Sequence, residues 1–157
     1  MHSNKKYLLS IVFIMFVFPL LSMIIEGISD HWRTHLIELI GKWFVFWAIG
    51  IRLFMAGINQ VMRPGFTVQK IFKIDDPQSH AFVRELGFAN ISIGTLGLLS
   101  LFVPQLLLSA AISGGLFLGL AGIHHIIKKP ASTNEYIAMI TDLLIFLIML
   151  FYVISQF

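Results

Sequence analysis

The stretch YIAMITDLLIFLIMLFYVISQF, residues 136–157, decides the fold class, because Asp142 is its only charged residue. A helix of this length is about 33 Å long at 1.5 Å per residue, which is enough to cross the ~30 Å hydrocarbon core of a bilayer. Four other stretches have the same character: Tyr7–Ile25, Leu39–Met62, Phe82–Val103 and Leu106–Ile127. The sequence therefore predicts five transmembrane helices.

The composition agrees with an integral membrane protein. Hydrophobic residues make up 57% of the chain and charged residues 12%, and the mean hydropathy is +0.87. A soluble domain of this size would expose too much apolar surface. Backbone groups in lipid must be hydrogen-bonded internally, and these stretches are too long for barrel strands of about ten residues. We expect an all-α protein.

The 157 residues leave only short connections between the spans, so no soluble domain is expected. We predict two parts: residues 1–30 form the first helix and an outer loop, and residues 31–157 form a four-helix membrane bundle. Short links between neighbouring helices make them pack antiparallel. The chain has no cysteine, which excludes disulfides, thiolate nucleophiles and cysteine-ligated metals.

The basic residues predict the orientation of the spans. With a cytoplasmic N-terminus, eight lysines and arginines lie on the inner side and two on the outer side, which fits the positive-inside rule. The eight are Lys5, Lys6, Arg63, Lys70, Lys73, Arg84, Lys128 and Lys129, and the two are Arg33 and Lys42. We therefore predict five crossings, with the N-terminus in the cytoplasm and the C-terminus outside. The net charge of +3 then reflects orientation, with no nucleic-acid partner.

The first stretch has an alternative interpretation as a signal peptide, because Lys5 and Lys6 precede it. Its length, and the lack of a small-x-small cleavage pattern after it, favour an uncleaved helix.

Three connections carry recognisable signals. Arg63-Pro64-Gly65 predicts the end of the second helix. Residues 66–80, FTVQKIFKIDDPQSH, alternate apolar and basic side chains, which fits either a short amphipathic helix on the inner leaflet or an ordinary solvated loop. Pro104 predicts a tight outer hairpin. One residue of Ser132-Thr133-Asn134 is expected to cap the last helix.

The sequence also suggests an internal repeat. LFMAGINQVMRP, residues 53–64, resembles LGLAGIHHIIKKP, residues 118–130, and the helices that follow carry Arg84-Glu85-Leu86 and Thr141-Asp142-Leu143. If the repeat is real, helices two and three form one hairpin, and helices four and five form a second copy in the same orientation. Chance similarity between apolar sequences is the alternative.

Ionisable and amide side chains within the spans are the candidate functional residues, because such groups are costly in lipid and usually face protein or water. We predict that six of them line one intramembrane pocket that opens towards the cytoplasm: Arg52, Asn59, Glu85, Asn90, His124 and Asp142. The alternative is a buried ion pair between Arg52 and either Glu85 or Asp142 that only fixes the helix register.

Other site chemistries have little support in the sequence. Adjacent His124 and His125 point about 100° apart on a helix and do not readily share one metal ion. The chain contains no Walker loop, dinucleotide fingerprint, Gly-x-Ser-x-Gly elbow or His-Glu-x-x-His motif. Nucleotide-driven and hydrolase functions are therefore not indicated.

Three segments carry a resemblance to known proteins: GKWFVFWAIGIRLFMAGINQVMRP, RELGFANISIGTLGLLSLF and LAGIHHIIKKP. From Gly41 onwards the chain resembles a bacterial membrane-protein family of unknown function, and RELGFAN is its most specific piece. More distantly it is similar to the DoxX-like group, which includes quinone-linked subunits of thiosulfate oxidation. The resemblance implies a four-helix bundle and a quinone or other lipophilic ligand. With the predicted orientation, it also implies a protein of the bacterial inner (cytoplasmic) membrane. The additional N-terminal helix departs from the four-helix pattern.

Three functions follow as hypotheses. The leading one is a redox-associated quinone or lipid site, in which Arg52 holds a carbonyl or anionic head group while a carboxylate and His124 relay protons. The second is a small proton-coupled transporter that uses buried acidic residues. The third is a non-catalytic subunit with a membrane-protein partner or a homo-oligomer, docked through its glycine-rich helix faces.

Overall fold

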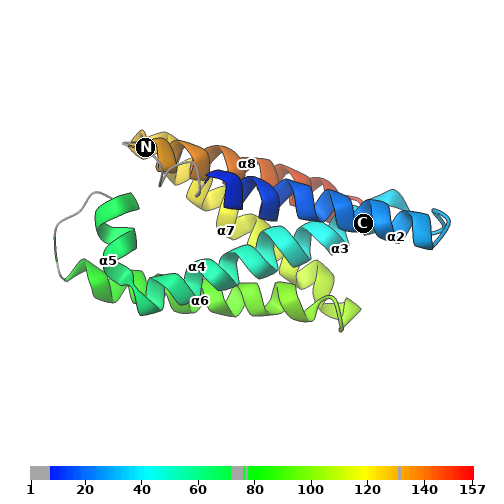
Figure 1. Ribbon diagram of the computed structural model, residues 1–157, viewed down its shortest axis with the longest axis horizontal. Coiled ribbons are helices and arrows are strands. Elements are labelled where there is room, and N and C mark those ends of the chain that lie inside the picture. Colours follow the sequence, from blue (N-terminus) through cyan, green and yellow to red (C-terminus); the bar gives the residue numbers. More distant parts are fainter. Residues whose placement is uncertain (1–7, 72–75, 77, 131) are drawn as a thin grey trace.

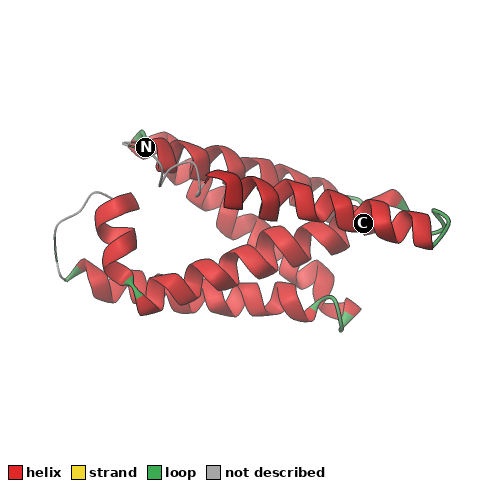
Figure 2. Cartoon of the chain, in the orientation of Figure 1, coloured by secondary structure: helices red, strands yellow, loops and turns green. Residues whose placement is uncertain are grey.

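The computed structural model describes residues 8–71, 76, 78–130 and 132–157. Within them five helical segments are long and apolar enough to cross a membrane: Leu8–Ser29, Leu36–Met62, Ser79–Leu99, Pro104–Lys128 and Thr133–Ile154. The described chain is helical throughout, apart from its connections (Figure 2). The prediction of an all-α, five-span membrane fold is confirmed.

The first two segments each contain a wide π-helical turn. The first consists of η1 (Phe13–Val17) and α2 (Phe18–Ser29), preceded by residues 8–12. The second consists of α3 (Leu36–Phe44), the seven-residue π-helix η2 (Val45–Ile51) and α4 (Arg52–Met62). A π-turn bonds residue i to i+5 and is most often found as a single bulge inside an α-helix. In the second segment this bulge ends directly before Arg52.

The remaining segments are regular helices joined by short turns. They are α6 (Ser79–Leu99), α7 (Leu107–Lys128), preceded by the 3₁₀ turn η4 (Pro104–Leu106), and α8 (Thr133–Ile154). The third helix begins three residues before the apolar stretch Phe82–Val103. It also ends four residues earlier, because residues 100–103 form the turn before Pro104. Ser132 caps α8, since its Oγ accepts a hydrogen bond from the backbone N–H of Glu135 at 3.2 Å.

Two helical hairpins make up the larger part of the molecule. α4 packs along α6, and α7 packs along α8, while η2 contacts both α6 and α7. The two hairpins lie close together near the turn between α6 and α7 and diverge towards the end that carries α5 (Figure 1). We call the latter the α5 end. The α5 end is where α4 and α7 finish and α6 and α8 begin.

Close backbone contact holds the first hairpin together. At Gly57 of α4, an added Cβ would lie 2.6 Å from the carbonyl oxygen of Gly87 in α6. Only glycine permits two helix backbones to approach so closely. At Gly50 an added Cβ would lie 2.9 Å from the backbone of Gly97. Glycine therefore sets which face of α6 turns towards α4.

The first helix packs on the second span and contributes to the same buried core as the two hairpins. α2 packs on α3 and η2, and the rings of Phe18 and Trp47 lie with centroids 4.8 Å apart. The buried apolar core includes Met15, Leu39, Val45, Ile49, Leu53, Ala110, Leu118, Ile145 and Met149.

The connection after α4 is helical at its start. α5 (Pro64–Phe66) and the π-turn η3 (Thr67–Ile71) follow Arg63 directly. Thr67 and Val68 of η3 are 3% and 1% exposed, so one side of this segment packs on the rest of the protein. Phe66 and Gln69 on its other side are exposed. Of the rest of the predicted segment, residues 72–75 and 77 lie outside the described residues, and Ser79 and His80 begin α6.

Candidate functional site

An ion pair joins the two hairpins. Arg52, the first residue of α4, donates from Nη2 to Oδ1 of Asp142 in α8 at 2.5 Å. The two side chains are 15% and 7% exposed. Of the two partners that the sequence allowed for Arg52, the structure therefore brings Asp142 to it.

The pair lies deep within the span. Arg52 precedes the end of α4 at Met62 by ten residues, and Asp142 follows the start of α8 at Thr133 by nine. At 1.5 Å per residue both groups are about 14–15 Å from the α5 end, which is close to the middle of a ~30 Å hydrocarbon layer. The two depths match, so the helices can join their charges without tilting either side chain towards water.

The pair does not use all the hydrogen-bonding capacity of Arg52. Nη1 is buried and has no partner among the described residues. A guanidinium group carries five N–H donors and no acceptor, so this nitrogen can donate only to an oxygen supplied from elsewhere. A carbonyl or anionic oxygen is the natural acceptor for such a group.

Asn90 occupies a different place, the interface between α4 and α6. Its Nδ2 donates to Oε1 of Gln60 at 2.7 Å, and the residue is 3% exposed. Its Oδ1 is buried without a partner in the described part of the chain. Gln60, which sequence reasoning passed over, therefore completes a polar contact beside the close approach of Gly57 and Gly87.

The other three predicted residues are not joined to the ion pair. Asn59 is half-buried, whereas Glu85 and His124 are exposed. Within the described residues no hydrogen bond or ion pair links any of them to Arg52 or Asp142. The rings of His124 and His125 are 6.4 Å apart and tilted, and the described residues contain no cluster of three His, Asp or Glu that could hold a metal. A common pocket for all six residues stays a prediction.

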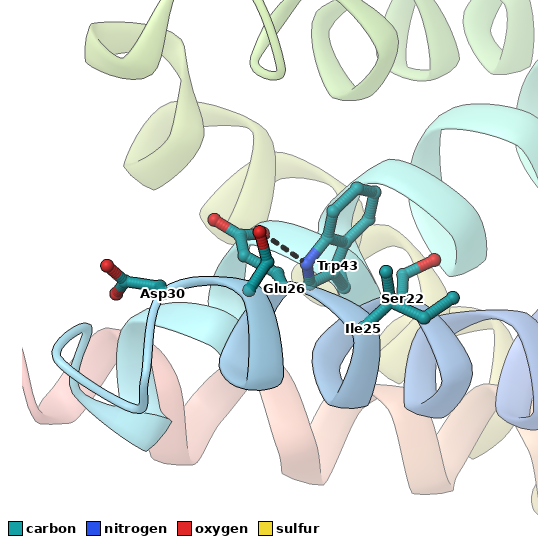
Figure 3. A pocket seen from close by; sticks show the side chains of 6 residues that line it. Ser22, Ile25, Glu26, Asp30 and Trp43 are labelled. Atoms are coloured by element: carbon teal, nitrogen blue, oxygen red, sulfur yellow. Dashed lines mark hydrogen bonds between the residues drawn. The ribbon is translucent and has the colours of Figure 1, made fainter.

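Sequence reasoning missed a second polar cluster, which fastens the first helix to the second. Oε1 of Glu26 accepts from Nζ of Lys42 at 2.6 Å, and Oε2 accepts from Nε1 of Trp43 at 2.7 Å (Figure 3). Nε1 of Trp47 donates to Oγ of Ser22 at 3.0 Å. The available signal was an acidic residue directly after the first apolar stretch and a lysine near the start of the second.

This cluster borders an open groove of about 510 Å³ at the surface. Glu26 and Trp43 line it together with Ser22, Ile25, Ser29 and Asp30 (Figure 3). Both carboxylate oxygens of Glu26 already accept hydrogen bonds from the protein itself.

A buried carboxylate at the start of α8 was also missed. The side chain of Glu135 is 0% exposed and lies 3.2 Å from Nζ of Lys128. The pattern Ser132-x-x-Glu135 is the capping-box signature, in which an acidic residue stands three positions after the N-cap serine. That spacing is the sequence signal that distinguishes Glu135 from an ordinary loop residue.

Comparison with known proteins identifies a family. The model of a family of unknown function, DUF6790, matches residues 9–156. No curated protein and no solved structure matches the chain. Since the matched region includes nearly the whole of the five spans, the chain belongs to the DUF6790 family, whose function is unknown.

Proposed function

We propose that this protein binds a lipophilic molecule through Arg52, between its two hairpins, and that the ligand presents a carbonyl oxygen to Nη1. The observation that carries the proposal is the buried Nη1, which has no hydrogen-bond partner within the described chain. A donor left unpaired away from water costs about 1–3 kcal/mol. A ligand oxygen at this position would remove that cost.

Charge balance favours a neutral ligand. The charges of Arg52 and Asp142 cancel within the ion pair, so an anionic head group would leave a net negative charge in the bilayer interior, where an unpaired charge is expensive. A quinone accepts a hydrogen bond through its carbonyl and adds no charge. The resemblance to the DoxX-like group, with its quinone-linked members, supports the same ligand class.

The proposal is limited to binding. Proton relay through His124 would need a contact with the ligand site, but His124 lies exposed on α7. Asp142 is the one titratable group in direct contact with Arg52 among the described residues. We therefore assign Asp142 the role of holding the guanidinium in place, so that its second nitrogen faces the ligand.

The test is quinone binding by the full chain in lipid nanodiscs, with Arg52→Lys as the diagnostic variant. Lysine keeps the positive charge beside Asp142 but lacks the second nitrogen of the guanidinium fork. We expect the affinity for a short-chain quinone to fall about tenfold, which corresponds to one hydrogen bond of ~1.4 kcal/mol. The matched control is Arg63→Lys, because Arg63 is exposed directly after the end of α4. Equal affinity of Arg52→Lys and the unmodified chain, or no binding by either, would rule the proposal out.

We also propose that the α5 end faces the cytoplasm of a bacterial cell and that the protein lies in its inner membrane. Arg63, Arg84, Lys128 and Lys129 are exposed near the α5 end, and an excess of basic residues marks the cytoplasmic side. Single cysteines at Ser132 and His35 can test this in a chain that otherwise lacks cysteine. An impermeant maleimide added to intact cells should label His35→Cys and spare Ser132→Cys. The reverse pattern would contradict the orientation.

A further inference from the structure

Two charged side chains on α6 face outwards within the span. Arg84 and Glu85 are both exposed, and no hydrogen bond or ion pair reaches either of them in the described part of the chain. Glu85 follows the start of α6 at Ser79 by six residues, which places it about 9 Å into the layer at helical rise. α6 lies at the edge of the molecule (Figure 1).

An exposed and unpaired carboxylate within a membrane span is unusual. Acidic and basic side chains within membrane spans almost always face protein or a water-filled cavity, and they pair with one another. The outer face of α6 therefore lacks the partner that its charges require. Asp142 of the same protein follows this rule, because it is buried and forms an ion pair with Arg52.

We propose that this face of α6 binds α6 of a second copy of the chain, in a dimer whose twofold axis is parallel to the membrane normal. Such an axis places the same residues of both copies at the same depth. Arg84 of one copy then meets Glu85 of the other, and the symmetry repeats the contact, giving two ion pairs. The adjacent opposite charges make the face complementary to itself, so no other partner is needed. This inference does not depend on the proposed ligand site.

The surroundings of Glu85 permit close approach. Ala81, Ala89 and Ser92 are exposed or half-exposed and lie within about 40° of Glu85 around the helix at 100° per residue. The hydroxyl of Ser92 already donates to the backbone oxygen of Phe88 at 2.9 Å, so it needs no acceptor from a second helix. The opposite side of α6, which includes Gly87 and Asn90, is buried against α4. The two sides of α6 thus serve different neighbours.

The experiment is disulfide cross-linking in lipid of single-cysteine variants of the full chain, which has no cysteine of its own. Ala89→Cys lies on the proposed interface. Leu120→Cys is the matched control, because Leu120 is 67% exposed on α7 at a similar depth. We expect several-fold more cross-linked dimer for Ala89→Cys at low protein-to-lipid ratio. Equal cross-linking of both variants would overturn the proposal.

A charge swap tests the pairing itself in the Ala89→Cys background. Glu85→Arg alone puts four positive charges at the interface and should abolish the cross-link. Adding Arg84→Glu restores opposite neighbours and should recover it. If the single change has no effect, or the swap fails to recover the dimer, the ion-pair interface is wrong. Counting photobleaching steps of the labelled, otherwise unmodified chain in lipid provides a second readout, and single-step traces would also overturn the dimer.

Discussion

The two hairpins place similar carboxylates in opposite environments. Glu85 near the start of α6 is exposed, whereas the side chain of Asp142 in α8 is 7% exposed and bound to Arg52. The two carboxylates differ in exposure because the two hairpins pack differently. In one, large side chains of one helix lie against glycines of the other, and in the other, glycines of both helices meet. In the α7–α8 hairpin, Leu143 and Phe146 of α8 fill the space beside glycines of α7. In the α4–α6 hairpin, glycines of both helices face each other, which turns Glu85 away from the bundle.

Depth in the membrane and direction around the helix are therefore separate properties of a charged residue. Depth follows from position along the apolar stretch. Direction follows from the side chains that pack on the opposite face, and this decides whether a carboxylate is a structural partner or a surface group.

The largest expected effect separates these two carboxylates. Asp142→Ala leaves Arg52 without its counter-charge, and breaking a buried ion pair from one side costs about 3–5 kcal/mol. Glu85→Ala should change the free energy of unfolding by no more than about 0.5 kcal/mol in detergent at concentrations where the chain is monomeric. Thermal unfolding of both variants measures the difference.

The double variant Arg52→Met with Asp142→Leu is the control for this prediction. Replacing both members of a buried pair by apolar side chains is often close to neutral, so most of the lost stability should return. Equal losses for Asp142→Ala and Glu85→Ala would mean that direction does not decide the role of the two groups.

A second expected difference concerns the glycines of the two hairpins. A Cβ at Gly57 would lie 2.6 Å from a backbone oxygen of Gly87, whereas at Gly122 it would lie 2.7 Å from Cγ of the Leu143 side chain. Backbone cannot yield without moving a helix, but a leucine can change rotamer. We expect Gly57→Ala to cost about 3 kcal/mol and Gly122→Ala about 1 kcal/mol, within the usual range for overpacking. Chemical unfolding in mixed micelles would measure both, and a greater loss for Gly122→Ala would contradict the packing described here.

Glu26 provides an intermediate case. Its side chain is 26% exposed but accepts two hydrogen bonds, from Lys42 and Trp43. We expect Glu26→Ala to cost about 1–2 kcal/mol, since hydrogen bonds to charged groups are worth more than neutral ones, and to alter tryptophan fluorescence. Ser29→Ala, which lines the same groove, is the control. If Glu26→Ala lowered the free energy of unfolding as much as Asp142→Ala, the number of hydrogen-bond partners, and not burial, would determine the contribution of a carboxylate to stability.

The smallest effect is expected at Asp30, which lies beyond the end of α2. The hydroxyl and the backbone N–H of Thr34 donate to its Oδ2 at 2.6 and 2.7 Å, and these bonds lower the pKa of Asp30 below its ordinary value of 3.8. A carboxylate with a lowered pKa stabilises the fold above its ordinary pKa, and this contribution disappears as the pH falls through the lowered value. Thr34→Val should raise the pKa of Asp30 towards 3.8, which a carbon NMR titration of the carboxyl group can follow. An unchanged titration would show that the Thr34 hydroxyl has no influence.

Five spans could be predicted from the sequence because hydrophobicity is a local property. The depth of Arg52 could be predicted for the same reason, since it needs only helical rise and the end of the span. Asp142 lies deeper than the stretch 136–157 indicates, because α8 already begins at Thr133. The choice of Asp142 over Glu85 could not, because it depends on the contact of Gly57 with Gly87 across two helices. Glu26 was missed because the first stretch was ended at Ile25, one residue before it.

The π-helical turn Val45–Ile51 holds one residue more than a regular α-helix needs between Phe44 and Arg52. Deleting a single residue there would let the segment close into regular α-geometry, and Arg52 would keep nearly the same direction towards Asp142. The same deletion within α4, after Arg52, would rotate everything that follows it by about 100°. One-residue deletions are therefore expected to be better tolerated in the π-turn than in α4. In alignments of related sequences, a one-residue gap in this span should fall between Phe44 and Arg52.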